Sequence, residues 1–393
     1  MLDLEKVFLI GIDGGATEVK AHHIEVISGD PMPDFKLGDL KASRKYKKIE
    51  GFHPIAVPTQ LTERTSNNIK LGKWEKMQGE EYIKSTFECI EELVSDKATP
   101  LLIGMGMPGL KTDDLRGINV INNGARIPDF LTQLEGKISE AGYTLASPIA
   151  RLGSDADYCG LGEEYASDGL FKDVANAYYC GGGTGIADAL KLKGEIVPLD
   201  KTKNWLHKSW QIISSIGLTY EKMVSASALC NTFANLSKTD WSELLSQERF
   251  PQEAAADGDP TAIALVQFVG AILGELLFER LTTIKKGREE LEYRGTAYAT
   301  LKTNHEFTGT ILDRVILGQR IGFIYAEPKY EKVFKKPVDN CLAWWIKNYG
   351  DDEMKSSYLD GDKIKDNLIV SSKLRAAPAI GAAVDAVRAL NGN

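Results

Sequence analysis

Residues 8–21 read FLIGIDGGATEVKA, and they are the most informative part of the chain because they join two strand-like runs through a glycine-rich turn. A second stretch of the same design, AYYCGGGTGIADAL, occupies residues 177–190. Glycines permit positive φ and let backbone amides approach a ligand closely. Successive amides in such a turn form an anion-binding concavity, and a threonine hydroxyl adds one more donor. The two turns therefore predict a polyphosphate-binding site in which each turn contacts one side of the ligand.

The composition is that of a folded protein with two domains. The chain has 393 residues, of which 43% are hydrophobic and 26% charged, which is too long for one compact core. Its net charge of −8 argues against a nucleic-acid binder with a basic face, and we interpret the basic run at residues 41–48 as a solvated loop face. The five cysteines include no C-x-x-C pair, which favours buried thiols in a reducing compartment over a thiolate metal site.

The sequence favours a cytoplasmic protein that binds no membrane. The most apolar segment, residues 262–278, carries Gln267 and Glu275 and is short for a membrane span, so we interpret it as a core helix. An acidic stretch followed at once by strand-like residues at the start of the sequence is not typical of a secretory signal.

Strand-like and helix-like runs alternate along the chain, which predicts an α/β fold, and the repeated hairpin predicts a duplicated architecture. Between Ser28 and Gly79 the chain is polar and contains prolines, so we expect one strand at residues 55–57 within a loop or insertion. The other predicted strands span residues 7–12, 20–27, 100–105, 148–152 and 314–317. Helices are predicted over residues 80–96, 128–142, 155–169 and 376–390, and after the cap Asp259-Pro260.

Five motifs, taken in order, resemble the ROK family of bacterial sugar kinases and repressors, within the sugar-kinase, heat-shock-ATPase and actin superfamily. The likeness spans residue 7 to about residue 387. The motifs are DGGAT at 13–17 (first phosphate motif), GMGMPG at 104–109 ("G-[IV]-G-x-P-G"), SDAD at 154–157 with GLGE at 160–163 ("N-D-A-N…A-L-G-E"), GTGI at 183–186 ("G-T-G-[IV]-G") and GAA at 381–383.

The resemblance implies duplicated actin-like (ribonuclease H-like) domains, built from mixed sheets flanked by helices, with an interdomain cleft. The first domain would span residues 1–153 and be completed by a C-terminal helix at 376–391, and the second would span residues 154–375. In the acceptor half the sequence departs from the family, because residues 201–210 read KTKNWLHKSW, without the usual G-E-x-G-H segment or zinc-binding cysteine cluster. We therefore expect a retained nucleotide half and an altered sugar half.

The nucleotide and metal residues are predicted from the two turns. Asp13 ends an apolar strand and suits Mg²⁺, directly or through water, although an aspartate can also cap its own turn. Lys20 either reaches a phosphate or points to solvent. Gly318 lies where the family has a more glycine-rich adenosine loop. The predicted nucleotide-binding residues are Asp13, Gly14, Gly15, Thr17, Lys20, Gly182, Gly183, Thr184, Gly185 and Gly318.

Asp155 is the predicted general base, because it occupies the position of the catalytic aspartate in the family motif. The alternative is an acidic residue that simply suits a helix start after a Ser154 cap. Asn122 and Asn123 fall where the family places a sugar-binding asparagine, although asparagine is also common in turns. Together with Asp155 and Gly109, they are the predicted substrate-binding residues. His207 and Trp205 could contact a sugar, but packing is the default role for both.

The resemblance implies ATP- and Mg²⁺-dependent phosphorylation of a sugar hydroxyl, on a hexose or an N-acetylhexosamine. The alternative is a non-catalytic sensor of the same fold that binds a nucleotide or a sugar. A DNA-binding regulator is disfavoured because only six residues precede Val7, and an iron–sulfur activator ATPase would need paired cysteines. The expected partner is a small-molecule sugar, and a homodimer stays open.

Overall fold

The computed structural model describes residues 3–27 and 32–390. The chain forms two compact units, Met1–Gly169 with Ala376–Asn393, and Leu170–Arg375. The C-terminal segment thus belongs to the first unit, and the division lies after helix α4 (Asp155–Tyr165) instead of before it. The reason is packing: in α4, a Cβ atom on Gly162 would lie 2.3 Å from the carbonyl oxygen of Ala377, in helix α15 (Ala377–Leu390).

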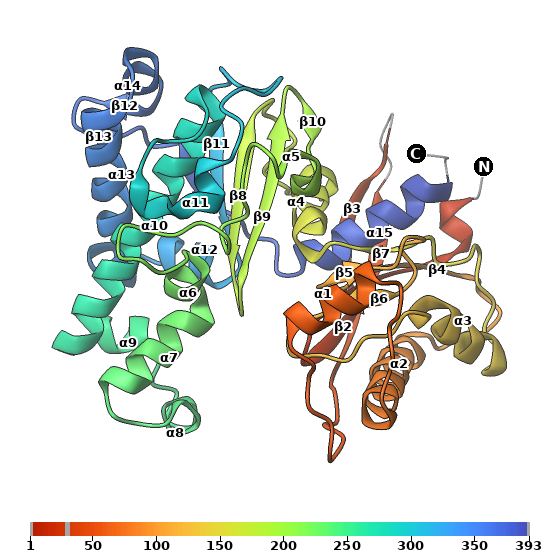
Figure 1. The fold of residues 1–393 in the computed structure, drawn as a ribbon. Helices are drawn as coiled ribbons and strands as arrows, with labels where there is room; N and C mark the ends of the chain where they lie inside the picture. The colour runs from red at the N-terminus through yellow and green to blue at the C-terminus, as the bar shows by residue number, and fades with distance from the viewer. Residues whose placement is uncertain (1–2, 28–31, 391–393) are drawn as a thin grey trace. The chain divides into compact units, whose positions relative to one another are not determined.

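The first unit is built on a five-stranded mixed sheet of order β3-β2-β1-β4-β7 (Figure 1). Strands β1, β2 and β3 are antiparallel neighbours, whereas β4 and β7 run parallel to β1. A separate two-stranded ribbon, β5 with β6, follows β4. The strands are β1 (Phe8–Gly14), β2 (Glu18–Ile27), β3 (Asp34–Lys45), β4 (Leu101–Gly106), β5 (Leu110–Lys111), β6 (Ile118–Val120) and β7 (Leu152–Gly153).

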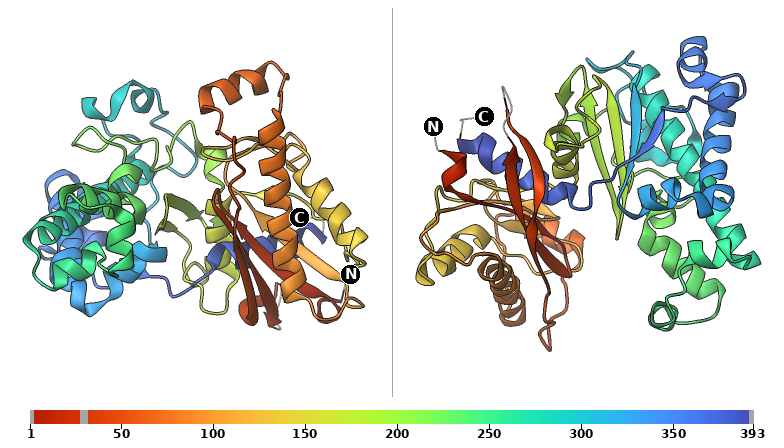
Figure 2. Two further views of the ribbon diagram at one scale, coloured as in Figure 1. Left: turned by 90° about the horizontal axis from the view of Figure 1, so that it is seen from below. Right: turned by 180° about the vertical axis from the view of Figure 1, so that it is seen from behind.

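Successive side chains of each strand point to opposite faces of this sheet, and helices cover both faces. Ile10 and Ile12 of β1 lie in one core with helix α2 (Lys73–Leu93) and helix α3 (Phe130–Glu140). Gly11, on the opposite face, meets α15, where a Cβ atom would lie 1.9 Å from the carbonyl oxygen of Ala379. Figure 2 shows α15 beside this sheet. The glycine therefore lets a helix backbone rest directly on the strand.

Residues 32–79, the described part of the segment between Ser28 and Gly79, contain more regular structure than their composition predicts. The strand expected at residues 55–57 is absent, and this prediction is wrong, because helix α1 (Val57–Thr65) begins there with Pro58 in its first turn. The segment instead contributes β3, whose exposed face is polar and so gives a weak hydrophobic signal. The short 3-10 helix η1 (Leu4–Lys6) precedes β1.

The second unit repeats the same sheet, with the order β10-β9-β8-β11-β14. Strands β8, β9 and β10 are antiparallel neighbours, and β11 and β14 run parallel to β8. The predicted duplication is thereby confirmed. The strands are β8 (Ala177–Gly182), β9 (Ile186–Leu192), β10 (Glu195–Ile196), β11 (Arg314–Gly318) and β14 (Ile369–Ser371), with the small pair β12 (Leu359–Asp360) and β13 (Lys363–Ile364).

Helix α10 (Pro260–Lys286) is the central helix of the second unit. Asp259 caps it by accepting hydrogen bonds from the amides of Thr261 and Ala262, as the sequence predicts. By length and composition alone α10 could cross a membrane, but 67% of its apolar 18-residue stretch is buried inside the structure. The other helices are α5 (Leu199–Thr202), α6 (Glu221–Val224), α7 (Ala226–Leu236), α8 (Trp241–Ser246), α9 (Pro251–Ala256), α11 (Gly295–Ala299), α12 (Gln319–Ala326), α13 (Lys336–Tyr349) and α14 (Asp352–Tyr358), with η2 (Glu292–Arg294), η3 (Pro328–Tyr330) and η4 (Glu331–Lys335).

Candidate functional site

The first glycine turn, residues 13–17, closes the β1–β2 hairpin in the first unit. Asp13 pairs with Lys20 across the hairpin and with Gly106 on the neighbouring strand β4. Gly14 is enclosed, because a Cβ atom there would lie 2.0 Å from the Met107 sulfur. The amide of Gly15 donates to the carbonyl oxygen of Glu18 at 2.8 Å, which closes the turn. Its shape is thus fixed by backbone contacts, and Thr17 is exposed at its end.

Asp155 and Asp13 form an acidic pair within the first unit. Asp155 is the first residue of α4, directly after β7, and its cap Ser154 accepts from the amide of Asp157 at 3.4 Å. Gly106 lies between the two aspartates: it pairs with Asp13, and a Cβ atom on it would lie 3.8 Å from the Asp155 Cα. Burial raises the pKa of Asp13 to about 6, and the negative charge of Asp155 adds to this rise. The two carboxylates therefore act on each other electrostatically.

The acidic pair is suited to a Mg²⁺ ion that keeps several waters, and not to a metal ion held by protein side chains alone. Among residues 3–27 and 32–390, no group of three or more His, Cys, Asp and Glu side chains is arranged to hold a metal ion. Mg²⁺ binds oxygen, keeps several waters, and in phosphate-transfer sites uses one or two carboxylates plus substrate phosphates. Asp13 and Asp155, two carboxylates close to one another, are a donor set of this kind.

Lys20 lies beside the first turn but is engaged by a neighbour. Its Nζ is 2.7 Å from Oε1 of Glu18, and both side chains are partly exposed. An exposed ion pair of this type contributes little to stability. The structure thus places Lys20 at the turn, with its charge directed to Glu18.

The predicted acceptor residues also lie in the first unit. Gly109 has φ of 93°, and a Cβ atom there would lie 2.3 Å from the carbonyl oxygen of Val120, so a glycine is needed directly before β5, where the β5–β6 ribbon begins. Asn122 and Asn123 follow β6 directly, and both are exposed. Asn123 has a left-handed backbone with φ of 57°, which asparagine tolerates. We call residues 121–125 the acceptor loop.

Two buried polar side chains support these segments, and neither was predicted from the sequence. Gln60 of α1 accepts from the amide of Ile121 at 2.9 Å and donates to its carbonyl oxygen at 3.0 Å. Tyr82 of α2 donates from Oη to the carbonyl oxygen of Ala16 at 2.8 Å. A single glutamine or tyrosine within a helix gives no motif. The available signal is its place on the buried face of an amphipathic helix, where a polar atom needs a partner.

The second glycine turn, residues 182–185, closes the β8–β9 hairpin in the second unit. The amide of Gly183 donates to the carbonyl oxygen of Gly185 at 3.0 Å. The amide of Ile186 donates to Oε2 of Glu221 at 3.0 Å, so a carboxylate from α6 braces this turn. Thr184 is exposed at its tip.

Gly318 lies next to the second turn, and its role in nucleotide binding stays a prediction. It ends β11 opposite Gly181, and a Cβ atom on it would lie 2.1 Å from the Tyr179 hydroxyl oxygen. Gln319 follows with φ of 56° and forms a bridge with Gly182. The second unit therefore brings Gly318 and Gly182 together at the ends of parallel strands.

One of the candidate sugar contacts in the altered segment, residues 201–210, is a side chain of the core. Trp205 is fully buried and stacks on His305 with ring centroids 4.5 Å apart. His207 is half-buried, and burial followed by the charge of Arg280 lowers its pKa. Trp205 is thus a packing residue, in agreement with its default role.

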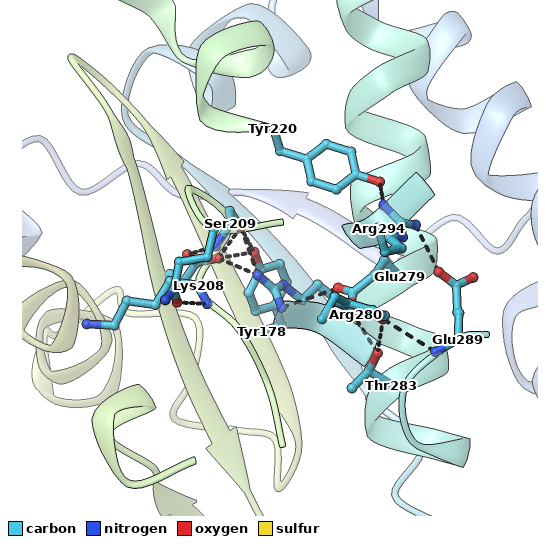
Figure 3. A network of polar contacts seen from close by, with 12 residues as sticks. Tyr178, Lys208, Ser209, Tyr220, Glu279, Arg280, Thr283, Glu289 and Arg294 are labelled. Atoms are coloured by element: carbon cyan, nitrogen blue, oxygen red, sulfur yellow. Dashed lines mark hydrogen bonds and ion pairs between the residues drawn. The ribbon is translucent and has the colours of Figure 1, made fainter. Parts of the chain in front are cut away.

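A buried network of polar side chains holds this segment against α10, as Figure 3 shows. Arg280 donates from Nη2 to the hydroxyl of Ser209 at 3.0 Å, and the amide of Ser209 donates to Asp188 at 2.8 Å. Arg294 donates to Glu289 at 2.8 Å and also bonds the Tyr220 hydroxyl. Paired charges and hydroxyls therefore hold the segment in place.

Comparison with known proteins identifies the fold. No family model and no curated protein matches the chain. Several solved structures match over nearly the whole chain. A ROK family glucokinase from Streptomyces griseus, in complex with glucose and AMPPNP, has a TM-score of 0.58 at 14% identity, covering 97% of this chain and 99% of its own. A glucokinase from Parabacteroides distasonis has a TM-score of 0.53 at 14% identity, covering 98% of both chains. A ROK hexokinase from Thermus thermophilus has a TM-score of 0.52 at 16% identity, covering 98% and 99%. The chain has the fold of ROK sugar kinases, which confirms the predicted fold class.

Proposed function

We propose that this protein is an ATP-dependent kinase that phosphorylates the hydroxyl of a hexose or N-acetylhexosamine. The observation that carries the proposal is the acidic pair, Asp13 with Asp155, in the same unit as a phosphate-type turn and the acceptor loop. Phosphoryl transfer requires mainly positioning and charge stabilisation, and these residues supply both.

Asp155 serves as the general base in this proposal. Its carboxylate takes the proton from the attacking sugar hydroxyl, and its place as the first residue of α4 fixes its backbone at the start of the helix. Asp13 holds Mg²⁺ directly or through water, which neutralises charge on the phosphate oxygens when the ion is bound. The two aspartates thus have different roles although they lie close together.

The remaining residues orient the two substrates. In the first unit, Gly14, Gly15 and Thr17 of the first turn serve the phosphates of the nucleotide. In the second unit, the turn at residues 182–185, with Thr184 exposed at its tip, and the neighbouring Gly318 are a further nucleotide-binding segment. Gly109, Asn122 and Asn123 orient the sugar hydroxyls. A solved glucokinase of the same fold with glucose and AMPPNP supports ATP as donor and a sugar as acceptor. We place the reaction in the cytoplasm.

The test is a coupled assay of ADP release with Mg·ATP over a panel of hexoses and N-acetylhexosamines. Sugar-stimulated ADP release, with a phosphorylated sugar detected by mass spectrometry, is the expected result. Nucleotide binding by calorimetry without turnover on any sugar would instead support a non-catalytic sensor. ADP release that is independent of sugar would indicate an ATPase with a different acceptor.

A further inference from the structure

Tyr82 contacts two segments that the proposed reaction needs. Its ring is 3% exposed, on the inner face of α2. Its Oη donates to the carbonyl oxygen of Ala16 in the first turn at 2.8 Å. The same oxygen lies against the acceptor loop, where a Cβ atom on Gly124 would lie 3.3 Å from it. One hydroxyl therefore bonds the first turn and packs against the acceptor loop.

Tyr46 packs against the same ring and offers an internal comparison. The two rings stack with centroids 3.9 Å apart and an interplanar angle of 18°. The amide of Tyr46 donates to the carbonyl oxygen of Thr17 at 2.9 Å. In the part of the chain that the structure describes, the Tyr46 hydroxyl has no hydrogen-bond partner. The two tyrosines share their packing, but the Tyr82 hydroxyl contacts both the turn and the loop.

We infer that Tyr82 is a positioning residue that holds the first turn and the acceptor loop in register, an inference that rests on the proposed function. The first turn carries Asp13, and the acceptor loop carries Asn122 and Asn123. Because catalysis between two bound substrates depends on sub-ångström placement, a hydroxyl that contacts both segments sets the geometry between them. Burial raises the pKa of Tyr82 to about 12, so the hydroxyl keeps its proton and remains a donor at neutral pH.

The acceptor loop is also fixed from the other side, which explains why loss of Tyr82 would misplace the loop without unfolding it. Gln60 bonds both the amide and the carbonyl oxygen of Ile121. Arg126, with its side chain fully buried, is paired with Glu75 at 2.8 Å and with Glu63. These contacts frame the loop, and Tyr82 supplies the link between the loop and the turn.

The test compares Tyr82→Phe with Tyr46→Phe, since each change removes one buried hydroxyl and preserves the ring stack. In Tyr82→Phe we expect amide hydrogen exchange to rise about fivefold in peptides covering both residues 14–17 and residues 121–125, as for the loss of one hydrogen bond. We also expect KM to rise about fivefold for both ATP and sugar. Tyr46→Phe should leave exchange and both KM values within about twofold of wild type.

The outcomes separate the inference from the proposed function. Faster exchange in both peptides of Tyr82→Phe, with Tyr46→Phe unchanged, supports the positioning role even where no sugar is phosphorylated. A merely structural role predicts a lower melting temperature with unchanged exchange in these peptides and unchanged KM, and that result overturns the inference. Absence of sugar-dependent turnover in the wild-type chain overturns the proposed function alone.

Discussion

The two units have the same sheet order but differ in where charged side chains lie relative to the glycine turn. In the first hairpin, Asp13 pairs with Lys20 one register position before the turn. The equivalent pair in the second hairpin is Gly181 with Ala187. The charges of the second unit gather behind its turn, in the network around Arg280. The duplicated architecture thus provides two similar turns, and the residue pair at this register position is charged in the first hairpin and uncharged in the second.

The aspartates of the two units differ in the partners that balance their charge. In the second unit, Asp188 is buried with a hydroxyl, an amide and Arg280 as partners, which is the usual condition for a buried charge. In the first unit, Asp13 is half-buried near another carboxylate, and its raised pKa shows that its charge is poorly balanced by the protein. Such an imbalance is typical of a site that awaits a cation or a proton transfer.

Asp155→Asn gives the largest expected effect, because it removes the base and leaves the turn intact. We expect kcat for sugar phosphorylation to fall by about 10²–10⁴-fold. Nucleotide affinity, measured by calorimetry, should stay within about twofold, since neither turn is altered. Asp157→Asn, in the same first turn of α4, is the matched control and should retain wild-type kcat. Retention of turnover in Asp155→Asn would remove its assigned role and with it the functional contrast between the units.

Arg280→Met tests the second unit by leaving buried carboxylates without their cation. Removal of one partner of a buried ion pair costs about 3–5 kcal/mol, so we expect the second unit to be destabilised by this order. Urea unfolding followed by tryptophan fluorescence measures it, because five of the six tryptophans lie in this unit. Arg249→Met, which breaks an exposed pair with Asp259, is the control and should cost under about 1 kcal/mol. Equal losses in the two variants would contradict the structural role of the network.

Periodicity and turn chemistry were sufficient to predict most of the fold. The hairpins at both turns, α10 with its Asp259 cap and the final helix follow local rules that the sequence displays directly. Strand β3 and helix α1 could not be predicted, because a polar edge strand lacks a clear apolar alternation and α1 is held by tertiary contacts of Gln60 and Glu63. Local propensity is overridden in such segments.

The candidate site was predictable only where residues form motifs. Asp13, Gly14 and Asp155 belong to short patterns, so their roles could be hypothesised before their proximity was known. Tyr82 and Gln60 could not be found in this way, because each acts through contacts with the backbone of segments distant in sequence. Glu221 on the second turn is of the same kind. The supporting contacts of a site depend on tertiary structure, and a motif does not contain them.

Asp13→Asn tests the imbalance of charge in the first unit through pH. The pKa of Asp13 is raised from 3.8 to about 6, so the folded chain binds more protons than the unfolded chain between these values. Wild-type stability should therefore fall as pH rises from about 4 to about 6, by up to about 3 kcal/mol, and Asp13→Asn should lack this contribution. Thermal unfolding by circular dichroism across this range measures the difference. At neutral pH, Mg²⁺ should stabilise wild type and not Asp13→Asn. Identical pH profiles would show that the charge of Asp13 is already balanced.

Lys20→Met has the smallest expected effect and decides how far the charge of the first turn extends. Lys20 is held by Glu18 in a partly exposed pair, so its loss should change stability by under about 0.5 kcal/mol and KM for ATP by under about twofold. Ala187 occupies the corresponding place in the second hairpin, which indicates that such a turn forms without a cation there. Glu18→Gln is the companion variant, since it frees Lys20 without removing it. A rise of about tenfold in KM for ATP in Lys20→Met, reduced at high salt, would instead assign Lys20 to the phosphates. The contrast between the units would then include a cation as well as the acidic pair.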